Sequence, residues 1–336
     1  MNLTNHQFRL SSRPVGKPKR SDWNYTEEPV REPGNGEFLA KVLQISLDPA
    51  MRGWMSPMRS YIPPVGIGEV MRALATGRVI ASNNPNFGMG DHVGGLFGVQ
   101  EYAISNGLGV NKVDTRLAPL PKYLSVLGMP GMTAYFGFLD TGAPQPGNTV
   151  VVSAASGAVG SVVGQIAKIK GCRAVGIAGS KQKCEYVSRE LGFDAAIDYK
   201  SEDVSAALRK QCPNGIDVYF DNVGGDILDT VLTQINLGAR IVICGAISQY
   251  NNTTPVQGPS NYFQLLIKRA TMKGMLVTDF IDRYPQAARE MAGWMAAGKL
   301  KSREDIVEGM QNFPEALVKL FTGENFGKLI LKVSDS

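Results

Sequence analysis

Histidine and cysteine are scarce in this 336-residue chain, which holds two histidines and four cysteines. The histidines are His6 and His92, and the cysteines, without a CxxC pair, are Cys172, Cys184, Cys212 and Cys244. Structural zinc sites need four closely spaced Cys or His ligands, and catalytic ones need three protein ligands. The chain supplies neither set, nor the paired cysteines of a disulfide framework. We therefore expect reduced thiols, no metal and no metal-assisted alcohol oxidation.

Long apolar runs suited to a membrane are also missing. The uncharged stretch 141–167 is interrupted by prolines, glycines, serines and threonines, which do not suit a membrane-spanning helix. The first ten residues contain Asn, Thr, His, Gln and Arg where a secretory signal peptide needs an apolar core. We expect a cytoplasmic protein with no membrane partner.

Neither sign of charge dominates, because 35 Lys and Arg oppose 30 Asp and Glu and leave a net charge of +5. The basic residues are spread along the chain, so this balance does not require nucleic acid, and an anionic small ligand is enough to account for it. The length exceeds what one hydrophobic core usually supports. We therefore expect two domains.

A glycine-rich turn follows the β-branched run 149–152 and precedes a helical pattern that Gly171 closes. The turn reads AxGxxG at Ala155, Gly157 and Gly160, one glycine short of the dinucleotide fingerprint GxGxxG. In that fingerprint, Gly157 lets the backbone approach a pyrophosphate, and Gly160 lets the helix pack on the strand. The helix N-terminus adds N–H groups and the positive end of its dipole. The alternative is an ordinary loop, but the strand before it and the helix after it favour a nucleotide site.

The rest of the chain divides into two patterns. Residues 1–125 carry short apolar runs with a period near two between turn residues, which predicts a β-rich domain. From about Leu127 strands alternate with helices, which predicts an α/β fold with a doubly wound parallel sheet. The predicted strands are 149–152, 173–178, 195–198, 216–220, 239–244 and 271–277. The predicted helices between them include 181–191, 201–211 and 226–237. The C-terminal run KLILKV is strand-like and is expected to rejoin the β-rich domain.

The choice between NAD and NADP depends on the end of the second strand. An NAD site needs an acidic residue there for the ribose hydroxyl, but the segment GIAGSKQK at 176–183 has none. Charge-assisted hydrogen bonds from Ser180, Lys181 or Lys183 would favour the 2′-phosphate of NADP. The alternative is that these lysines only begin a surface helix. We predict NADPH/NADP+ as the cofactor.

Seven motifs together resemble one enzyme family. They are SLDPAMRG, LGMPGMTAY, AASGAVG, KGCRAVGIAGS, YFDNVGG, CGAISQYN and ENFGK, and they span nearly the whole chain. In this order they resemble the zinc-independent medium-chain reductases of alkenals and alkenones. That family includes leukotriene dehydrogenase, prostaglandin reductase, plant double-bond reductases and bacterial curcumin reductase.

The resemblance implies a GroES-like catalytic domain from residues 1–125 and 301–336, with a Rossmann NADP-binding domain, 126–300, inserted between them. It also implies NADPH in the cleft and a homodimer joined through the nucleotide domains. The implied cofactor contacts are Gly157, Ala158, Val159, Gly160, Lys183, Tyr199, Asn222, Cys244, Gly245, Ala246, Ile247, Ser248, Tyr250 and Asn325; Ser180 is added to them from the 2′-phosphate argument above. Ala50 departs from the family, where many relatives have the tyrosine of DPYMRG. The proton donor to the α-carbon is therefore open.

The resemblance assigns a conjugate reduction to this inventory. Hydride goes to the β-carbon of an α,β-unsaturated ketone or aldehyde, and the negative charge that develops on the carbonyl oxygen needs a hydrogen-bond donor. Tyr250 is the expected catalytic donor, directly or through the cofactor ribose; alternatively it only packs on the cofactor. Arg52, Tyr61 and Tyr135 are expected to shape the substrate pocket, although Arg52 is equally suited to an ion pair and Tyr135 to a core helix.

Two other functions fit the same fold. One is an NADPH:quinone oxidoreductase, which differs in its electron acceptor. The other is a non-catalytic NADPH-binding or sensor protein, which would bind the nucleotide without consuming it. The products formed from enones, enals and quinones distinguish the three.

Overall fold

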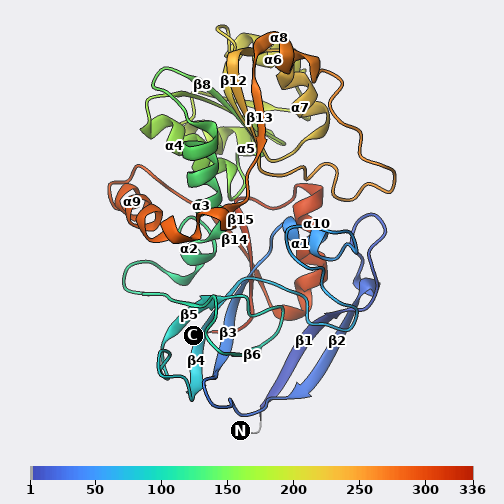
Figure 1. The fold of residues 1–336 in the computed structure, drawn as a ribbon, viewed down its shortest axis with the longest axis vertical. Coiled ribbons are helices and arrows are strands. Elements are labelled where there is room, and N and C mark those ends of the chain that lie inside the picture. The colour runs from blue at the N-terminus through green and yellow to red at the C-terminus, as the bar shows by residue number, and fades with distance from the viewer. Residues whose placement is uncertain (1–2, 336) are drawn as a thin grey trace. The chain divides into compact units, whose positions relative to one another are not determined.

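The computed structural model describes residues 3–335. The described chain forms two compact units, and both ends of the chain contribute to the first. Unit 1 runs up to Leu124 and resumes at Glu304, and unit 2 is Ser125–Arg303. In Figure 1 the blue N-terminal elements and the red C-terminal elements accordingly lie in the same unit.

Unit 1 is rich in β-structure. Its seven-stranded sheet has the order β14-β15-β3-β4-β5-β7, with β6 also paired to β3, and β1 and β2 form a separate antiparallel pair. The strands are β1 (Thr4–Leu10), β2 (Trp23–Pro29), β3 (Phe38–Ser46), β4 (Ala75–Ser82), β5 (His92–Gly95), β6 (Tyr102–Ser105), β7 (Asn111–Lys112), β14 (Glu304–Glu308) and β15 (Lys328–Lys332). The helices are α1 (Ala50–Trp54), α2 (Leu120–Leu124) and α10 (Phe313–Thr322), with single 3-10 turns at Arg20–Asp22 and Met310–Asn312.

The C-terminal strand is an integral part of unit 1. β15 pairs antiparallel with β3, which places Ile330 opposite Ser46, and it pairs parallel with β14. Leu329, Ile330 and Leu331 are fully buried. The prediction that the KLILKV run rejoins the β-rich domain is confirmed.

Unit 2 contains a six-stranded parallel sheet with the order β10-β9-β8-β11-β12-β13. Its strands are β8 (Thr149–Ser153), β9 (Arg173–Ala178), β10 (Ala195–Asp198), β11 (Ile216–Asp221), β12 (Ile235–Ile243) and β13 (Thr271–Gly274). The chain builds outward from β8 to one edge, returns to β11, and then builds to the other edge. This is the doubly wound order of dinucleotide-binding sheets, and the fold prediction is confirmed. Strand order reverses between β8 and β11, where such sheets bind ligands at the carboxyl ends of their strands.

Helices connect the strands of unit 2. They are α3 (Met129–Phe136), α4 (Gly160–Ile169), α5 (Lys181–Glu185), α6 (Val204–Gln211), α7 (Gly225–Leu232), α8 (Phe263–Lys268) and α9 (Tyr284–Ala296). Wider π-helical turns occupy Gly137–Gly142 and Tyr186–Glu190, and a 3-10 segment occupies Val277–Arg283. The predicted helix 226–237 was too long, because α7 ends at Leu232 and β12 begins at Ile235.

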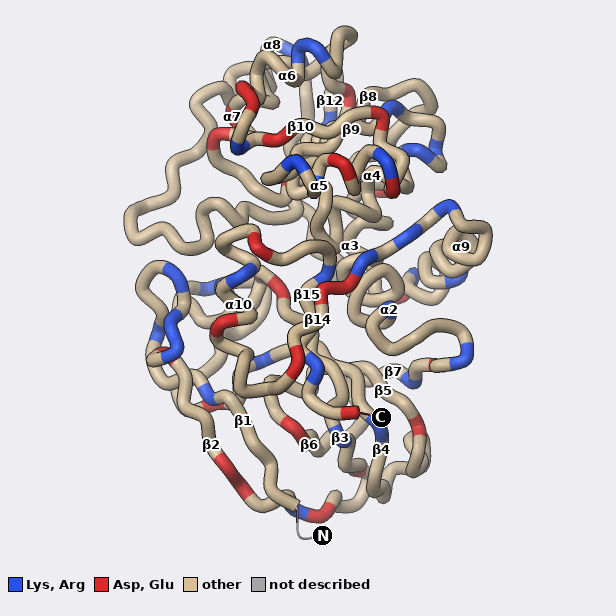
Figure 2. The backbone as a smooth tube through the Cα atoms, turned by 180° about the vertical axis from the view of Figure 1, so that it is seen from behind, with Lys and Arg blue, Asp and Glu red and all other residues tan. Residues whose placement is uncertain are grey.

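Charged residues of both signs are distributed over each unit (Figure 2). Among the described residues, no helix has the length and apolar character needed to cross a membrane.

Candidate cofactor site

The glycine turn between β8 and α4 is closed by its own backbone. Ala154 has a positive φ of 48°, and its carbonyl accepts a 2.9 Å hydrogen bond from the Gly157 N–H. A Cβ at Gly160 would lie 2.4 Å from that carbonyl oxygen, whereas a Cβ at Gly157 would lie 3.1 Å from it. Gly160 is therefore required by backbone packing. Gly157 keeps a surface without side-chain atoms, where a pyrophosphate can approach, and Ala158 and Val159 complete the turn.

The carboxyl ends of β9 and β10 bring together three predicted residues. Ser180 begins α5, and its hydroxyl oxygen accepts a 3.2 Å hydrogen bond from the Lys183 N–H. The Tyr199 N–H donates to the Ala178 carbonyl, and the Tyr199 ring covers Gly179, where a Cβ would lie 2.8 Å from the ring. Ser180, Lys183 and the ring of Tyr199 therefore lie at the strand ends where the adenosine end of a dinucleotide is expected.

The reversal point between β8 and β11 is held by Asn222. Its side-chain amide donates to the Ser153 carbonyl at 2.7 Å, and its backbone N–H donates to the Ser153 hydroxyl at 2.9 Å. These bonds join the last residue of β8 to the turn after β11. Asn222 thus lies where the strand order reverses, and its cofactor contact stays a prediction.

The loop after β12 is attached to the same turn. The N–H groups of Cys244 and Gly245 donate to the Asp221 carbonyl at 2.9 and 3.1 Å. Farther along, the Ile247 N–H donates to the Asn222 carbonyl, and both the N–H and the hydroxyl of Ser248 donate to the Val223 carbonyl. The predicted loop residues therefore form one hydrogen-bonded cluster at the carboxyl edge of the sheet.

Tyr250 bends back over this loop. Its hydroxyl oxygen accepts a 3.2 Å hydrogen bond from the Ala246 N–H, and a Cβ at Gly245 would lie 2.8 Å from the same oxygen. Gly245 is therefore needed to give the phenol room. A hydroxyl that accepts from a backbone N–H becomes a better donor through its own proton, as the proposed catalytic role requires.

Neither the Cys244 thiol nor the Tyr219 hydroxyl is suited to act as a nucleophile. Burial, together with the nearby Asp221 charge, raises the pKa of the Cys244 thiol to about 12, so the thiol is protonated at neutral pH. Burial and the same charge raise the pKa of Tyr219 well above its ordinary value. Both groups remain neutral. The chemistry of the site must therefore come from a bound cofactor and from hydrogen-bond donors.

The remaining predicted residues are placed elsewhere. Arg52 is 9% exposed in unit 1 and donates to the carbonyls of Pro14 and Gly16, so its guanidinium holds a loop. Burial lowers its pKa. Tyr61, also in unit 1, is 59% exposed and accepts a hydrogen bond from the Trp54 indole at 3.2 Å. Their substrate contacts stay predictions.

Two further residues are used locally. Tyr135 lies in α3, is 6% exposed, and donates from its hydroxyl to the Glu290 carboxylate on α9. Burial, then this hydrogen bond, raises the pKa of Tyr135. The structure favours the core-helix alternative for it over the pocket role. Asn325 precedes β15, and its amide donates to the Gly327 carbonyl at 3.1 Å. Its cofactor contact stays a prediction.

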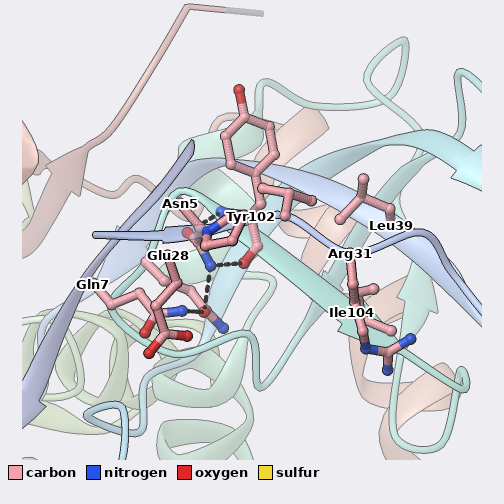
Figure 3. Close-up of a pocket in the computed structure, with 10 residues that line it drawn as sticks. Asn5, Gln7, Glu28, Arg31, Leu39, Tyr102 and Ile104 are labelled. Atoms are coloured by element: carbon pink, nitrogen blue, oxygen red, sulfur yellow. Dashed lines mark hydrogen bonds between the residues drawn. The ribbon is translucent and has the colours of Figure 1, made fainter. Parts of the chain in front are cut away.

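A separate pocket in unit 1 contains none of the predicted site residues. It has a volume of about 290 Å³, and its polar wall is an amide network in which Asn5 and Gln7 both donate to the Gln100 side-chain oxygen (Figure 3). Asn5 also donates to the Tyr102 carbonyl at 2.9 Å. These bonds attach β1 to the first residue of β6 and to Gln100 before it, so the network has a structural role.

Two family models match the sequence. One, described as the N-terminal domain of oxidoreductase, covers residues 6–113, and the other, described as zinc-binding dehydrogenase, covers residues 158–293. NADPH-dependent curcumin reductase of Escherichia coli is 43% identical over 98% of this chain and 97% of its own length. The NADP+-dependent 2-alkenal reductase of Nicotiana tabacum is 42% identical over 99% of this chain and 98% of its own length. The chain belongs to the family of zinc-independent alkenal and alkenone reductases.

A solved structure supports the same family assignment. CurA from Vibrio vulnificus in complex with NADPH is 45% identical and has a TM-score of 0.94, with 98% of this chain and all of that chain covered. The family resemblance seen in the motifs is therefore confirmed.

The name of the second family model raises the question of zinc. Among residues 3–335, no three His, Cys, Asp or Glu side chains gather into a group that could hold a metal ion. The four cysteines lie in unit 2 as free thiols, and both histidines lie in unit 1. The residues of this alkenal and alkenone reductase do not fit a zinc centre, and no reaction step is assigned to one.

Proposed function

We propose that this chain uses NADPH to reduce the carbon–carbon double bond of α,β-unsaturated ketones and aldehydes. The observation that carries the proposal is the gathering of the glycine turn, Ser180, Lys183 and the Tyr250 loop along the carboxyl edge of one parallel sheet, in a chain of this family. Its relatives include a curcumin reductase and a 2-alkenal reductase that use NADP.

The residues of unit 2 fit the two ends of a phosphorylated dinucleotide. The backbone at Gly157, free of side-chain atoms, receives the pyrophosphate at the N-terminus of α4. Lys183 and Ser180 receive the 2′-phosphate, because charge-assisted hydrogen bonds favour a dianion over a hydroxyl. Asn222 and the loop 244–250 would contact the nicotinamide end of the cofactor. We call the phosphate-binding residues Gly157, Ser180 and Lys183 the anchoring end of the site, and Asn222 with the loop 244–250 the reacting end.

Catalysis then depends on the donor that faces the carbonyl oxygen. Bound NADPH supplies the hydride for the β-carbon, and electron density moves onto the carbonyl oxygen of the acceptor. Tyr250 donates its hydroxyl proton to that oxygen, directly or through the cofactor ribose, while the Ala246 N–H stabilises the phenol oxygen. A proton from solvent then adds to the α-carbon and the enol proton returns to Tyr250, so the saturated product gains one hydride and one proton in total. Ala50 lies at the start of α1 and has only a methyl group, so it supplies no proton.

Tyr250→Phe tests this role. We expect a loss of turnover of about 10²- to 10⁴-fold, the usual range for a general acid, with nearly unchanged NADPH binding. The matched control is Tyr262→Phe, since Tyr262 is 64% exposed and lies outside the loop. If the Tyr250→Phe variant and the protein without the substitution turn over equally fast, Tyr250 has no catalytic role and only packs on the cofactor.

A panel of enones, enals and quinones tests the reaction class through NADPH absorbance and product analysis. A saturated ketone or aldehyde supports the proposal. A hydroquinone as the only product indicates the quinone oxidoreductase, and NADPH binding without consumption indicates the sensor.

Lys183→Ala tests the cofactor assignment. Loss of a charge-assisted contact should weaken NADPH by about one to two orders of magnitude and leave NADH nearly unaffected. Arg189→Ala, an exposed cation farther along the same segment, is the control. Equal losses for the two nucleotides contradict the phosphate contact.

The proposal includes a homodimer joined through unit 2 and a cytoplasmic location. β13 is an edge strand of the parallel sheet, and α8 beside it in sequence exposes large apolar side chains. Among them are Phe263 (57%), Leu266 (67%) and Ile267 (48%). Exposed apolar groups next to an open strand edge suit pairing with a second copy. Sedimentation of Leu266→Asp should then give a monomer, whereas a monomeric unchanged chain contradicts the dimer. Four free thiols agree with a reducing compartment.

A further inference from the structure

Asp221 is a buried carboxylate within the motif YFDNVGG, and neither the predicted site nor the proposed mechanism gives it a role. It is the last residue of β11 and is 0% exposed. One of its oxygens, Oδ1, accepts four hydrogen bonds, from the Tyr219 hydroxyl (2.7 Å), the Ser153 hydroxyl (3.1 Å), and the N–H groups of Val223 and Gly224 (3.0 Å each). A single oxygen therefore connects β8, β11 and the turn that begins α7.

The backbone of Asp221 extends this connection to the reacting end of the site. Its carbonyl accepts from the N–H groups of Cys244 and Gly245, which begin the loop that carries Tyr250. The same residue thus holds Ser153, the Asn222 turn and the loop after β12 at one point. The four donors to Asp221 Oδ1 do not include Ser180 or Lys183, which belong to the anchoring end.

The other carboxylate oxygen is arranged differently. Among the described residues, Asp221 Oδ2 is buried and has no hydrogen-bond partner. A buried acceptor without a donor costs stability, and more so when it is charged. A neutral amide of the same shape avoids the burial of a charge. The chain keeps a carboxylate here although its unpartnered oxygen lowers stability. We interpret this as a sign that Asp221 serves the functional site and not the stability of the fold.

We propose that Asp221 is a positioning residue that sets turnover by holding the Asn222 turn and the Tyr250 loop in register. The inference rests on the proposed function, because turnover is measured as enone reduction. Weakening the four hydrogen bonds to Oδ1 loosens the reacting end and leaves the phosphate contacts in place. Displacement by about 1 Å at a reacting centre is enough to lower a rate a hundredfold.

Asp221→Asn is the test, with Asp217→Asn as its matched control. Asp217 lies on the same strand near its other end, where its carboxylate accepts from the Thr149 N–H (2.7 Å) and the Asn236 amide (2.8 Å). For each variant, kcat and KM for an enone, the NADPH Kd and the melting temperature are measured. Asp221→Asn should lower kcat about tenfold or more, with Kd changed less than about threefold. Its melting temperature should shift by less than about 4 °C, the effect of about 1 kcal/mol in a unit of this size. Asp217→Asn should leave kcat within about twofold.

Several results overturn the inference. They are an unchanged kcat in Asp221→Asn, a Kd that rises in step with the loss of kcat, or an equal loss of kcat in the control. If Asp221→Asn does not fold, Tyr219→Phe removes one donor to Oδ1, and an unchanged kcat in that variant overturns it as well. If the protein without substitutions binds NADPH but reduces no enone, the proposed function itself is wrong, and the inference about Asp221 is then wrong as well.

Discussion

The two glycines of the turn after β8 should respond differently to the same added methyl group. At Gly160 a Cβ would lie 2.4 Å from the Ala154 carbonyl oxygen and 3.0 Å from the Ala155 Cα, which are backbone atoms that move only if the turn opens. At Gly157 the nearest atom would be 3.1 Å away, which a shift of a few tenths of an ångström relieves. Gly160→Ala should therefore damage the fold, and Gly157→Ala should damage ligand binding.

The expected changes in melting temperature and in NADPH affinity follow from these contacts. Overpacking of a rigid site costs about 1–3 kcal/mol, so Gly160→Ala should lower the melting temperature by roughly 2–12 °C. Gly157→Ala should change it by less than about 4 °C. The methyl group at Gly157 keeps the pyrophosphate from the backbone N–H groups, and loss of one charge-assisted hydrogen bond, about 1.5–3 kcal/mol, raises the NADPH Kd by roughly 10- to 150-fold.

Differential scanning fluorimetry without nucleotide and a calorimetric titration with NADPH measure the two effects separately. The reasoning about Gly157 is refuted if Gly157→Ala binds NADPH as tightly as the unchanged chain. The reasoning about Gly160 is refuted if Gly160→Ala melts at an unchanged temperature.

Three further predictions concern residues outside the cofactor loops. Tyr135→Phe should lower stability by about 1 kcal/mol, because the Glu290 carboxylate loses its donor, and should leave the enone KM unchanged; a raised KM in steady-state assays would restore the pocket role. Lys328→Met should destabilise unit 1 by about 3–5 kcal/mol in denaturant titrations, because Lys328 is 2% exposed and the charge of its partner Asp48 would remain buried without a counter-charge. Adding Asp48→Asn should recover much of the lost stability, and no recovery contradicts the ion pair. The hydrogen bond that the His6 ring donates to the Glu101 carboxylate raises the pKa of His6. His6 therefore stabilises the fold below its unfolded pKa near 6.5 and loses this effect as the pH rises through the raised pKa. His6→Gln should therefore lower the melting temperature by about 1–3 °C at pH 5.5 and not at pH 9, and an equal change at both pH values contradicts the pair.

Local signals made the parallel sheet and the glycine turn predictable. β8, β9 and β10 begin at the predicted residues because short, mostly apolar runs bounded by glycine and polar residues have few alternatives to a buried strand. The prediction failed between α7 and β12, where the apolar residues Leu232 and Ile235 fit the helical period, although the chain turns at Thr233 and Gln234. Periodicity alone cannot place such a boundary.

Long-range pairing explains what the sequence did not reveal. β14 has charged residues at three of its five positions, and only its pairing with β15 makes it a strand. Asp221 went unnoticed as a hub because its partner Ser153 is 68 residues away. The available signal was a polar residue at the end of the buried run Tyr219 and Phe220, at the carboxyl edge of a parallel strand. Arg52 and Tyr135 bind partners far away in the sequence, the Pro14 and Gly16 carbonyls and the Glu290 carboxylate, and the spacing of residues in the sequence does not specify such pairs.

Transfer of deuterium tests the central claim most directly. NADPH with deuterium at both hydrogen positions of the reactive nicotinamide carbon is incubated with the chain and an α,β-unsaturated ketone, and the product is examined by NMR and mass spectrometry. Hydride delivery to the electron-poor alkene predicts a saturated ketone with one deuterium on the β-carbon. Deuterium on the former carbonyl carbon of an alcohol, or NADPH oxidation with no deuterium in the product, would contradict it.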